Sequence, residues 1–162
     1  MSKWFRPCAG AIVFNRKGLV LLGKRIDVQE SAWQFPQGGI EKGETPLSAA
    51  QRELFEETSV VSVVPVYTDS QPSVYEFPEN IKQKFKKRGI ICDGQNIYFS
   101  LFYFTGEEKE INVETLQPEF SEYSWKEFDF VVKNIIDFKK EVYLCAMHKL
   151  KPIIKQYLDN LS

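Results

Sequence analysis

Apolar residues along this chain gather in short runs separated by turn-forming residues, a pattern that is typical of strands. Cys8–Phe14 and Leu19–Gly23 are two such runs with Asn15–Gly18 between them, so we predict two strands joined by a glycine-containing turn. Asn96–Thr105 is the strongest strand signal, and we predict that it lies at the centre of a sheet. Two further segments are predicted to be shorter strands: Val60–Val66 and Glu122–Lys126.

One helix has clear start and stop signals. Thr45 is a suitable N-cap, and Pro46 stands at the first helical position, where proline is tolerated. We expect this helix to end near Thr58–Ser59, because the residues that follow are β-branched. An apolar stripe at helical spacing is formed by Leu47, Ala50 and Leu54.

The remaining segments complete a mixed pattern of helices and strands. Residues 69–95 contain two prolines and two glycines and are predicted to form a long loop of the kind that carries specificity. Trp33–Pro36 should be extended, since the residue before a proline avoids the helical region. Phe138–Leu158 has a helical pattern in which Pro152 predicts a break or kink. Helices among strands predict a mixed sheet covered on its faces, an α/β or α+β sandwich.

Composition narrows the class of protein. The 162 residues suffice for one domain, expected over residues 1–162, and 43% hydrophobic with 27% charged residues indicates a globular chain. A net charge of −1 does not suggest a general nucleic-acid binder, so an anionic ligand would need a local basic patch or a metal ion.

Several classes of site and location are disfavoured. A single histidine argues against a histidine-rich zinc or copper site and against His-based triads. Three distant cysteines suit reduced thiols better than a disulfide framework. The N-terminus lacks a signal-peptide layout, and the most apolar window, Tyr98–Phe104, is far too short to span a membrane. We therefore expect a cytoplasmic protein with no membrane contact.

Three glutamates on the predicted helix carry the most informative chemistry. Glu53, Glu56 and Glu57 stand at positions i, i+3 and i+4, which share one helix face. Like charges at this spacing destabilise a helix by a few tenths of a kcal/mol per pair, and a hard divalent cation would offset that cost. The alternative interpretation is an ordinary solvated acidic face.

The surrounding residues, GGIEKGETPLSAAQRELFEETSV over 38–60, favour the cation. Gly38 begins G-x5-E, Glu44 begins E-x7-R-E, and an aliphatic residue and a glutamate pair follow. This segment resembles the Nudix box, G-x5-E-x7-R-E-U-x-E-E-x-G-U with U aliphatic, and every charged position of that pattern is filled. Ser59 replaces the family's glycine at the helix end, where glycine eases a left-handed turn.

The resemblance implies an α/β/α sandwich with a mixed sheet, in which the box is a catalytic loop–helix–loop. It implies hydrolysis of a nucleoside diphosphate linked to another moiety, using Mg²⁺ or Mn²⁺, with two or more ions expected. By the match, Glu53, Glu56 and Glu57 are metal ligands and the Gly38 backbone lies near the metal. Arg52 would orient a box carboxylate, and Glu44 would support the loop. The match does not assign the general base.

A narrower resemblance covers about Trp4 to Leu150. Phe5-Arg6-Pro7, Gln34–Gly39, Pro118-Glu119-Phe120 and Asp137–Tyr143 are similar to the bacterial RNA pyrophosphohydrolase and dinucleoside polyphosphate hydrolase branch. In Gln34–Gly39 a glutamine precedes the double glycine, where a proline is more usual. The match implies a further metal ligand or base at Glu119. Substrate contacts are implied at Arg6, Arg25, Gln37, Phe138 and Lys139.

Three of these residues also have plainer interpretations. Phe138 would stack on the base, a contact worth roughly 1–3 kcal/mol, or it is a helix core residue. Arg25 contacts phosphate or is a strand-end charge. Glu119 without the resemblance is an exposed glutamate before Phe120.

A basic stretch, IKQKFKKRG, lies within the predicted loop and contains Lys82, Lys84, Lys86, Lys87 and Arg88. One interpretation is a solvated loop that keeps the protein soluble. The other is a positive patch over 82–88 for RNA beyond its first nucleotides, with Phe85 among the cations. Tyr75, before this stretch, is a further candidate for substrate contact. Protein partners are not indicated.

Together these observations predict a Mg²⁺-dependent Nudix pyrophosphohydrolase. Its expected substrate is a nucleotide 5′-polyphosphate, either the 5′ end of triphosphorylated RNA or a dinucleoside polyphosphate such as diadenosine tetraphosphate. The alternative is a non-catalytic Nudix-like sensor that only binds nucleotide or RNA. Such modules typically lose box glutamates, whereas all three are present here.

Overall fold

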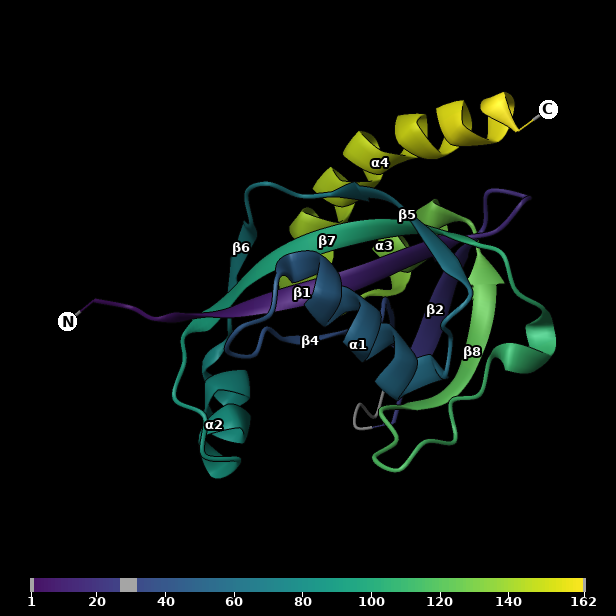
Figure 1. The fold of residues 1–162 in the computed structure, drawn as a ribbon. Coiled ribbons are helices and arrows are strands. Elements are labelled where there is room, and N and C mark those ends of the chain that lie inside the picture. The colour runs from purple at the N-terminus through teal and green to yellow at the C-terminus, as the bar shows by residue number, and fades with distance from the viewer. Residues whose placement is uncertain (1, 27–31, 162) are drawn as a thin grey trace.

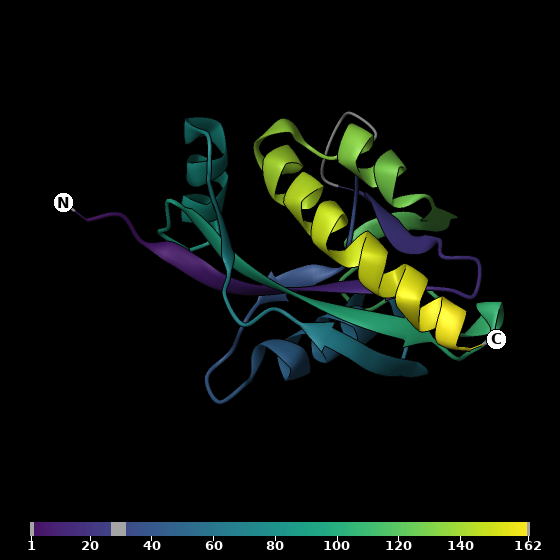
Figure 2. The ribbon, with the colours of Figure 1, turned by 90° about the horizontal axis from the view of Figure 1, so that it is seen from above.

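The computed structural model describes residues 2–26 and 32–161. A mixed sheet lies between helix α1 (Pro46–Thr58) on one face and helices α3 (Phe128–Asn134) and α4 (Lys140–Asn160) on the other, as Figure 1 and, from above, Figure 2 show. Helix α2 (Glu79–Lys87) projects from one end of the sheet, on the side of α4. This arrangement is the predicted α/β/α sandwich.

The eight strands found in the described residues form one sheet. The path runs β3-β2-β1-β7-β5, while β4 pairs with β1, β6 with β7, and β8 with β2. Strands β1 and β7 are parallel and the other pairs are antiparallel, which makes the sheet mixed. The strand bounds are β1 Phe5–Phe14, β2 Val20–Arg25, β3 Trp33–Gln34, β4 Gln37–Gly39, β5 Val63–Thr68, β6 Ser73–Glu76, β7 Gly94–Phe104 and β8 Phe120–Lys126.

The centre of the sheet and its first turn agree with the sequence pattern. Strand β7 pairs with β1 along its whole length, from Phe5 opposite Gly94 onward, which confirms the predicted central strand. In the turn between β1 and β2, the Asn15 side chain accepts the backbone N–H groups of Lys17 at 3.0 Å and of Leu19 at 3.1 Å. Gly18, which ends this turn, has φ +78°, the left-handed conformation that glycine adopts without strain.

Helix α1 begins and ends as predicted. The Thr45 hydroxyl accepts the Ser48 N–H at 3.1 Å, and the Ser48 hydroxyl accepts the Thr45 N–H at 2.9 Å. Ser59 adopts the left-handed conformation with φ 67°, and its N–H donates to the carbonyl of Phe55 at 2.8 Å. Its hydroxyl donates to the carbonyl of Asn112 at 2.9 Å. Serine therefore ends this helix with the geometry that the family's glycine would adopt.

The prediction of a long loop over residues 69–95 was wrong. Strand β6 pairs with β7 in this region, and the basic stretch is helix α2 rather than a loop. The helix forms because Ile81 and Phe85, four residues apart, give it an apolar side that packs on the core. The two prolines, Pro72 and Pro78, each stand just before one of these elements, where a proline is compatible with the strand or helix that follows.

Four smaller differences from the sequence predictions concern β5, α3, the start of α4 and Pro152. Strand β5 begins at Val63 rather than at Val60, and α3 lies in a segment for which no helix was predicted. A 3-10 turn over Asp137–Lys139 precedes α4, which begins at Lys140. Pro152 does not end α4, which continues to Asn160. Residues on both sides of this proline are buried against the sheet, and this packing offsets the lost hydrogen bond.

The sheet separates two hydrophobic cores of different composition. Between α1 and the sheet the buried side chains include the alanines Ala9, Ala11, Ala49 and Ala50 beside larger apolar residues. The core under α3 and α4 is larger and rich in aromatic rings. Within the described ranges, no helix has the length and apolar character needed to cross a membrane.

Candidate active site

The small core beneath α1 brings the helix close to strand β4. Gly38 and Gly39 on β4 pair with β1, and both lie against charged side chains. A Cβ on Gly38 would come within 2.2 Å of the Glu53 carboxyl group, and a Cβ on Gly39 within 2.3 Å of the Arg6 guanidinium. Only glycine permits these approaches, so the double glycine lets a carboxylate and a cation both lie directly against the β4 backbone.

Arg52 holds the loop and the helix of the box together. Its Nε and Nη2 donate to the two carboxylate oxygens of Glu44 at 2.7 and 2.9 Å. Its Nη1 donates to Glu53 at 2.7 Å and to Glu56 at 3.1 Å, and its Nη2 donates to the Gly39 carbonyl at 2.9 Å. Hydrogen bonds from Arg52 lower the pKa of Glu44 to about 2. The guanidinium thus fixes three carboxylates that would otherwise repel one another.

Glu57 is the most buried carboxylate of the box, with 6% of its surface exposed. It accepts the backbone N–H of Gln37 at 3.0 Å. Burial raises the pKa of Glu57 well above its usual range, and the charges of Glu53 and Glu119 raise it further. Burial also raises the pKa of Glu53, against the opposing effect of Arg52. A carboxylate in such surroundings favours either a proton or a nearby cation.

Glu119 reaches this group from outside the box, as the narrower resemblance implied. It directly precedes β8, whose first residue, Phe120, pairs with Arg25 beside a register shift. The Phe120 ring lies on Gly23, where a Cβ would overlap it at 2.2 Å. This packing sets the start of β8, and the exposed Glu119 carboxylate lies near enough to raise the pKa values of Glu53 and Glu57.

The glutamates do not all converge on one point. Glu56 is 53% exposed and bonded to Arg52, whereas Glu57 is buried against β4. Over residues 2–26 and 32–161, no three acidic, histidine or cysteine side chains form a ready-made metal cluster. The donor set still fits a hard divalent cation, because hard cations prefer carboxylate oxygens and the missing Cβ of Gly38 lets the Glu53 carboxylate lie directly against the β4 backbone.

On the other side of β4, the Gln37 side chain joins a hydrogen-bond network. Its Nε2 donates to the Tyr75 hydroxyl at 3.4 Å, and its Oε1 accepts the Tyr143 hydroxyl at 2.9 Å. The Tyr143 oxygen accepts the Phe35 N–H at 3.3 Å, and the Tyr75 hydroxyl donates to Gln95. A proline at position 37 would lack the N–H that binds Glu57. Gln37 therefore connects the carboxylates to the aromatic core.

The remaining predicted substrate contacts cluster around this network. Phe138 is half-buried, with its ring centroid 5.8 Å from Tyr75 and 5.7 Å from Phe77. Lys139 is buried, donates to Gln34 at 3.3 Å and lies over the Tyr75 ring. Phe138 thus packs on the core through one part of its ring, and stacking of a base on its exposed part stays a prediction.

Arg25, at the end of β2, lies near enough to Tyr75 and Tyr143 for its charge to oppose the rise in their pKa values. The structure therefore brings the predicted cations, aromatic residues and carboxylates to one end of the sheet. The network through Tyr143, Gln95 and Gln34 was not foreseen. The only sequence signal for it was the glutamine at the position where proline is more usual.

Comparison with known proteins agrees with this fold. The NUDIX domain family model matches residues 4–144. An RNA pyrophosphohydrolase of Roseobacter denitrificans is 40% identical over 147 residues, which cover 88% of this chain and 89% of that protein. One of Pelagibacter ubique is 38% identical over 153 residues, covering 92% and 93%. Among solved structures, a Caenorhabditis elegans Ap4A hydrolase has a TM-score of 0.63 at 17% identity, covering 96% and 98% of the two chains.

The fold and the box define a class of enzymes that hydrolyse phosphoanhydride bonds. The chain belongs to the Nudix family. It is a Nudix hydrolase acting on pyrophosphate bonds, and the comparisons do not support the alternative of a binding-only sensor. Nudix hydrolases generally require a divalent metal.

Proposed function

We propose that this enzyme removes pyrophosphate from the 5′ end of triphosphorylated RNA in the cytoplasm, with Mg²⁺ or Mn²⁺ as cofactor. The observation that carries the proposal is the 38–40% identity, over about nine-tenths of both chains, to proteins named RNA pyrophosphohydrolase. The side-by-side placement of carboxylates, cations and aromatic rings around β4 supports it.

In this proposal the carboxylates of Glu53, Glu56, Glu57 and Glu119, with the Gly38 backbone, hold two or more metal ions. Bound there, the ions would neutralise phosphate charge and lower the pKa of a bound water. Arg52 keeps Glu53 in place through a 2.7 Å hydrogen bond. The Gln37 N–H keeps Glu57 turned toward β4.

The substrate would lie across the double glycine. Arg6, which packs on Gly39, contributes positive charge for the phosphates, and Arg25 and Lys139 add to it from the aromatic side. The half-buried Phe138 forms the wall on which the first bases rest, and Tyr75, which is 5% exposed and so cannot contact a base directly as predicted, packs behind its ring. Water attacks one phosphorus of the α–β phosphoanhydride and forms a new P–O bond as the bridging P–O bond breaks. The water releases one proton, pyrophosphate departs, and a 5′-monophosphorylated RNA remains.

The test measures pyrophosphate release from 5′-triphosphorylated RNA, with and without Mg²⁺. We expect wild-type turnover that requires the metal and a loss of at least about a hundredfold in Glu57→Gln. Glu127→Gln, which changes an exposed glutamate just before α3 on the other face of the sheet from α1, serves as the matched control and should keep full activity. A wild-type enzyme that releases no pyrophosphate, or equal rates in wild type and Glu57→Gln, would refute the proposal.

Diadenosine tetraphosphate is the competing substrate, because the same carboxylates and aromatic wall would accept it. We expect kcat/KM to be higher for triphosphorylated RNA. A preference for the dinucleotide under identical conditions would move the proposed function to dinucleoside polyphosphate hydrolysis.

A further inference from the structure

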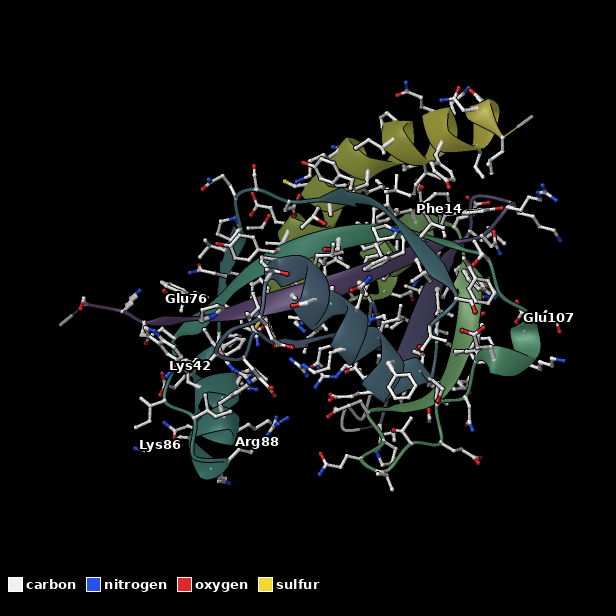
Figure 3. All side chains as sticks on the ribbon, viewed as in Figure 1. Phe14, Lys42, Glu76, Lys86, Arg88 and Glu107 are labelled. Carbon is white, nitrogen blue, oxygen red and sulfur yellow. The ribbon has the colours of Figure 1, made fainter. Side chains whose placement is uncertain are left out.

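Helix α2 has three sides with different chemistry. Ile81 and Phe85 form the apolar side that packs on the core. Lys82 and Lys86, four residues apart, share a second side, where Lys82 lies 3.5 Å from Asp93 and 3.9 Å from Glu76. The third side carries Lys84 and Lys87, and Arg88, the C-cap residue that directly follows the helix, extends it; we call these three residues the basic ridge. Figure 3 shows Lys86 and Arg88 on opposite sides of α2.

The basic ridge is exposed and has no acidic counterpart nearby. All three of its side chains lie at the surface. In the part of the chain that the structure describes, no carboxylate is within ion-pair distance of them, although Lys82 on the same helix has two. Each cation on the ridge therefore keeps its charge available for a partner from solution.

The apolar side of α2 connects the ridge to the candidate active site. The Phe85 ring stacks on Phe77 with centroids 4.8 Å apart, and Phe77 contacts the Phe138 ring at 5.7 Å. Arg88 lies over Phe85, 5.4 Å from its centroid. Phe85 is thus an anchor held between Phe77 and Arg88, and it is not a free platform for stacking bases. Phe85 therefore links the ridge to Phe138 through one intervening ring, that of Phe77.

We propose that the basic ridge binds the phosphate backbone of single-stranded RNA downstream of its first nucleotides. This inference rests on the proposed function, because the RNA 5′ end must lie at the box for its chain to pass Phe138 and reach α2. On the other side of the helix Lys82 is paired with Asp93 and Glu76, so that side offers less free positive charge and the RNA is expected on the ridge. Because the contacts are made to phosphates, they carry no sequence preference.

The experiment compares two 5′-triphosphorylated substrates, a dinucleotide and an RNA about twelve nucleotides long. Only the longer RNA has downstream phosphates that can reach the ridge. We expect Lys84→Ala/Lys87→Ala to turn over the dinucleotide like wild type and to lose most of the kcat/KM advantage of the longer RNA. Each single-strand phosphate contact contributes a salt slope of about −0.7, so raising salt fourfold should reduce that advantage about sevenfold more in wild type than in this variant.

The matched control is Lys86→Ala/Lys17→Ala, which removes the same net charge. Lys86 lies in the last turn of α2, on the side away from the ridge. Lys17 lies in the turn between β1 and β2, at a distance from α2. We expect this control to keep both the length advantage and the salt slope of wild type. Equal losses in the two double variants, or an unchanged length advantage in Lys84→Ala/Lys87→Ala, would overturn the inference. A wild-type enzyme inactive on both RNAs would instead refute the proposed function.

Discussion

The two faces of the sheet differ in what they bring to the site. On the α1 face, alanines such as Ala9 and Ala50 allow the helix to approach closely, and the helix presents carboxylates. On the α4 face, large rings such as Phe35 and Tyr143 fill the core, and cations lie at its edge. One face therefore suits metal ions, and the other suits bases and phosphates.

The short strand β4 joins these two faces. The Gln37 N–H binds Glu57 on the α1 face, while its side chain binds Tyr75 and Tyr143 on the other. Gly38 lies against Glu53 and Gly39 against Arg6. Neighbouring residues of one strand thus contact the proposed catalytic and recognition groups separately, so the two proposed roles can be tested apart by mutation.

The largest effect is expected on the carboxylate face. Arg52→Ala removes the hydrogen bonds that hold Glu44, Glu53 and Glu56, so the carboxylates move apart. A misplacement of about 1 Å in an active site can cost about a hundredfold, and we expect kcat to fall by at least that factor. Steady-state kinetics check this, with Arg16→Ala at an exposed turn as the control. Retained activity in Arg52→Ala would show that the carboxylates do not depend on the guanidinium.

The two glycines of β4 should separate kcat from KM. Gly38→Ala displaces the Glu53 carboxylate, and we expect kcat to fall by about tenfold or more. Gly39→Ala displaces the Arg6 guanidinium instead, and loss of a charged phosphate contact should raise KM by about tenfold. Each variant is the control for the other. Identical kinetic changes in both would contradict the assignment of separate roles.

Substitutions at Gln37 test the link between the faces. Gln37→Ala keeps the N–H that binds Glu57 and loses only the contacts to Tyr75 and Tyr143. Gln37→Pro loses the N–H as well. A hydrogen bond to a charged group is worth about 1.5–3 kcal/mol, so we expect Gln37→Pro to be about tenfold less active than Gln37→Ala. If the two variants have equal kcat values, the backbone bond to Glu57 has no catalytic importance.

The smallest effect concerns stability without metal. The folded state raises the pKa of Glu57 above its unfolded value, so the stability contributed by its proton is full at low pH and is lost as pH rises through the raised pKa. Glu57→Gln has no titrating carboxyl group at this position, so it does not lose this stability as pH rises. We therefore expect its Tm, relative to wild type, to rise by a few °C between acidic and neutral pH in chelator. A pH-independent Tm difference would contradict the raised pKa.

Local signals predicted the box almost completely. Thr45 and Pro46 mark the helix start, and helix geometry alone places Arg52 beside Glu56 at i+4. The predicted equivalence of the three glutamates was less accurate, because helix spacing does not show that β4 buries Glu57 and leaves Glu56 exposed. Burial depends on what packs against the helix, and that partner lies outside the local sequence.

From the sequence by itself, the resemblance of residues 38–60 to the Nudix box indicated the hydrolase class, while contacts between near neighbours and long apolar runs determined the charged helix face and the central strand. Only the tertiary structure decided that residues 79–87 form a helix, that Phe85 is an anchor and that the α2 cations lie on two sides. It also brought Tyr143 to Gln37 across 106 positions of the chain. Such contacts join distant segments, and the order of strands in the sheet, rather than any local preference, brings them together.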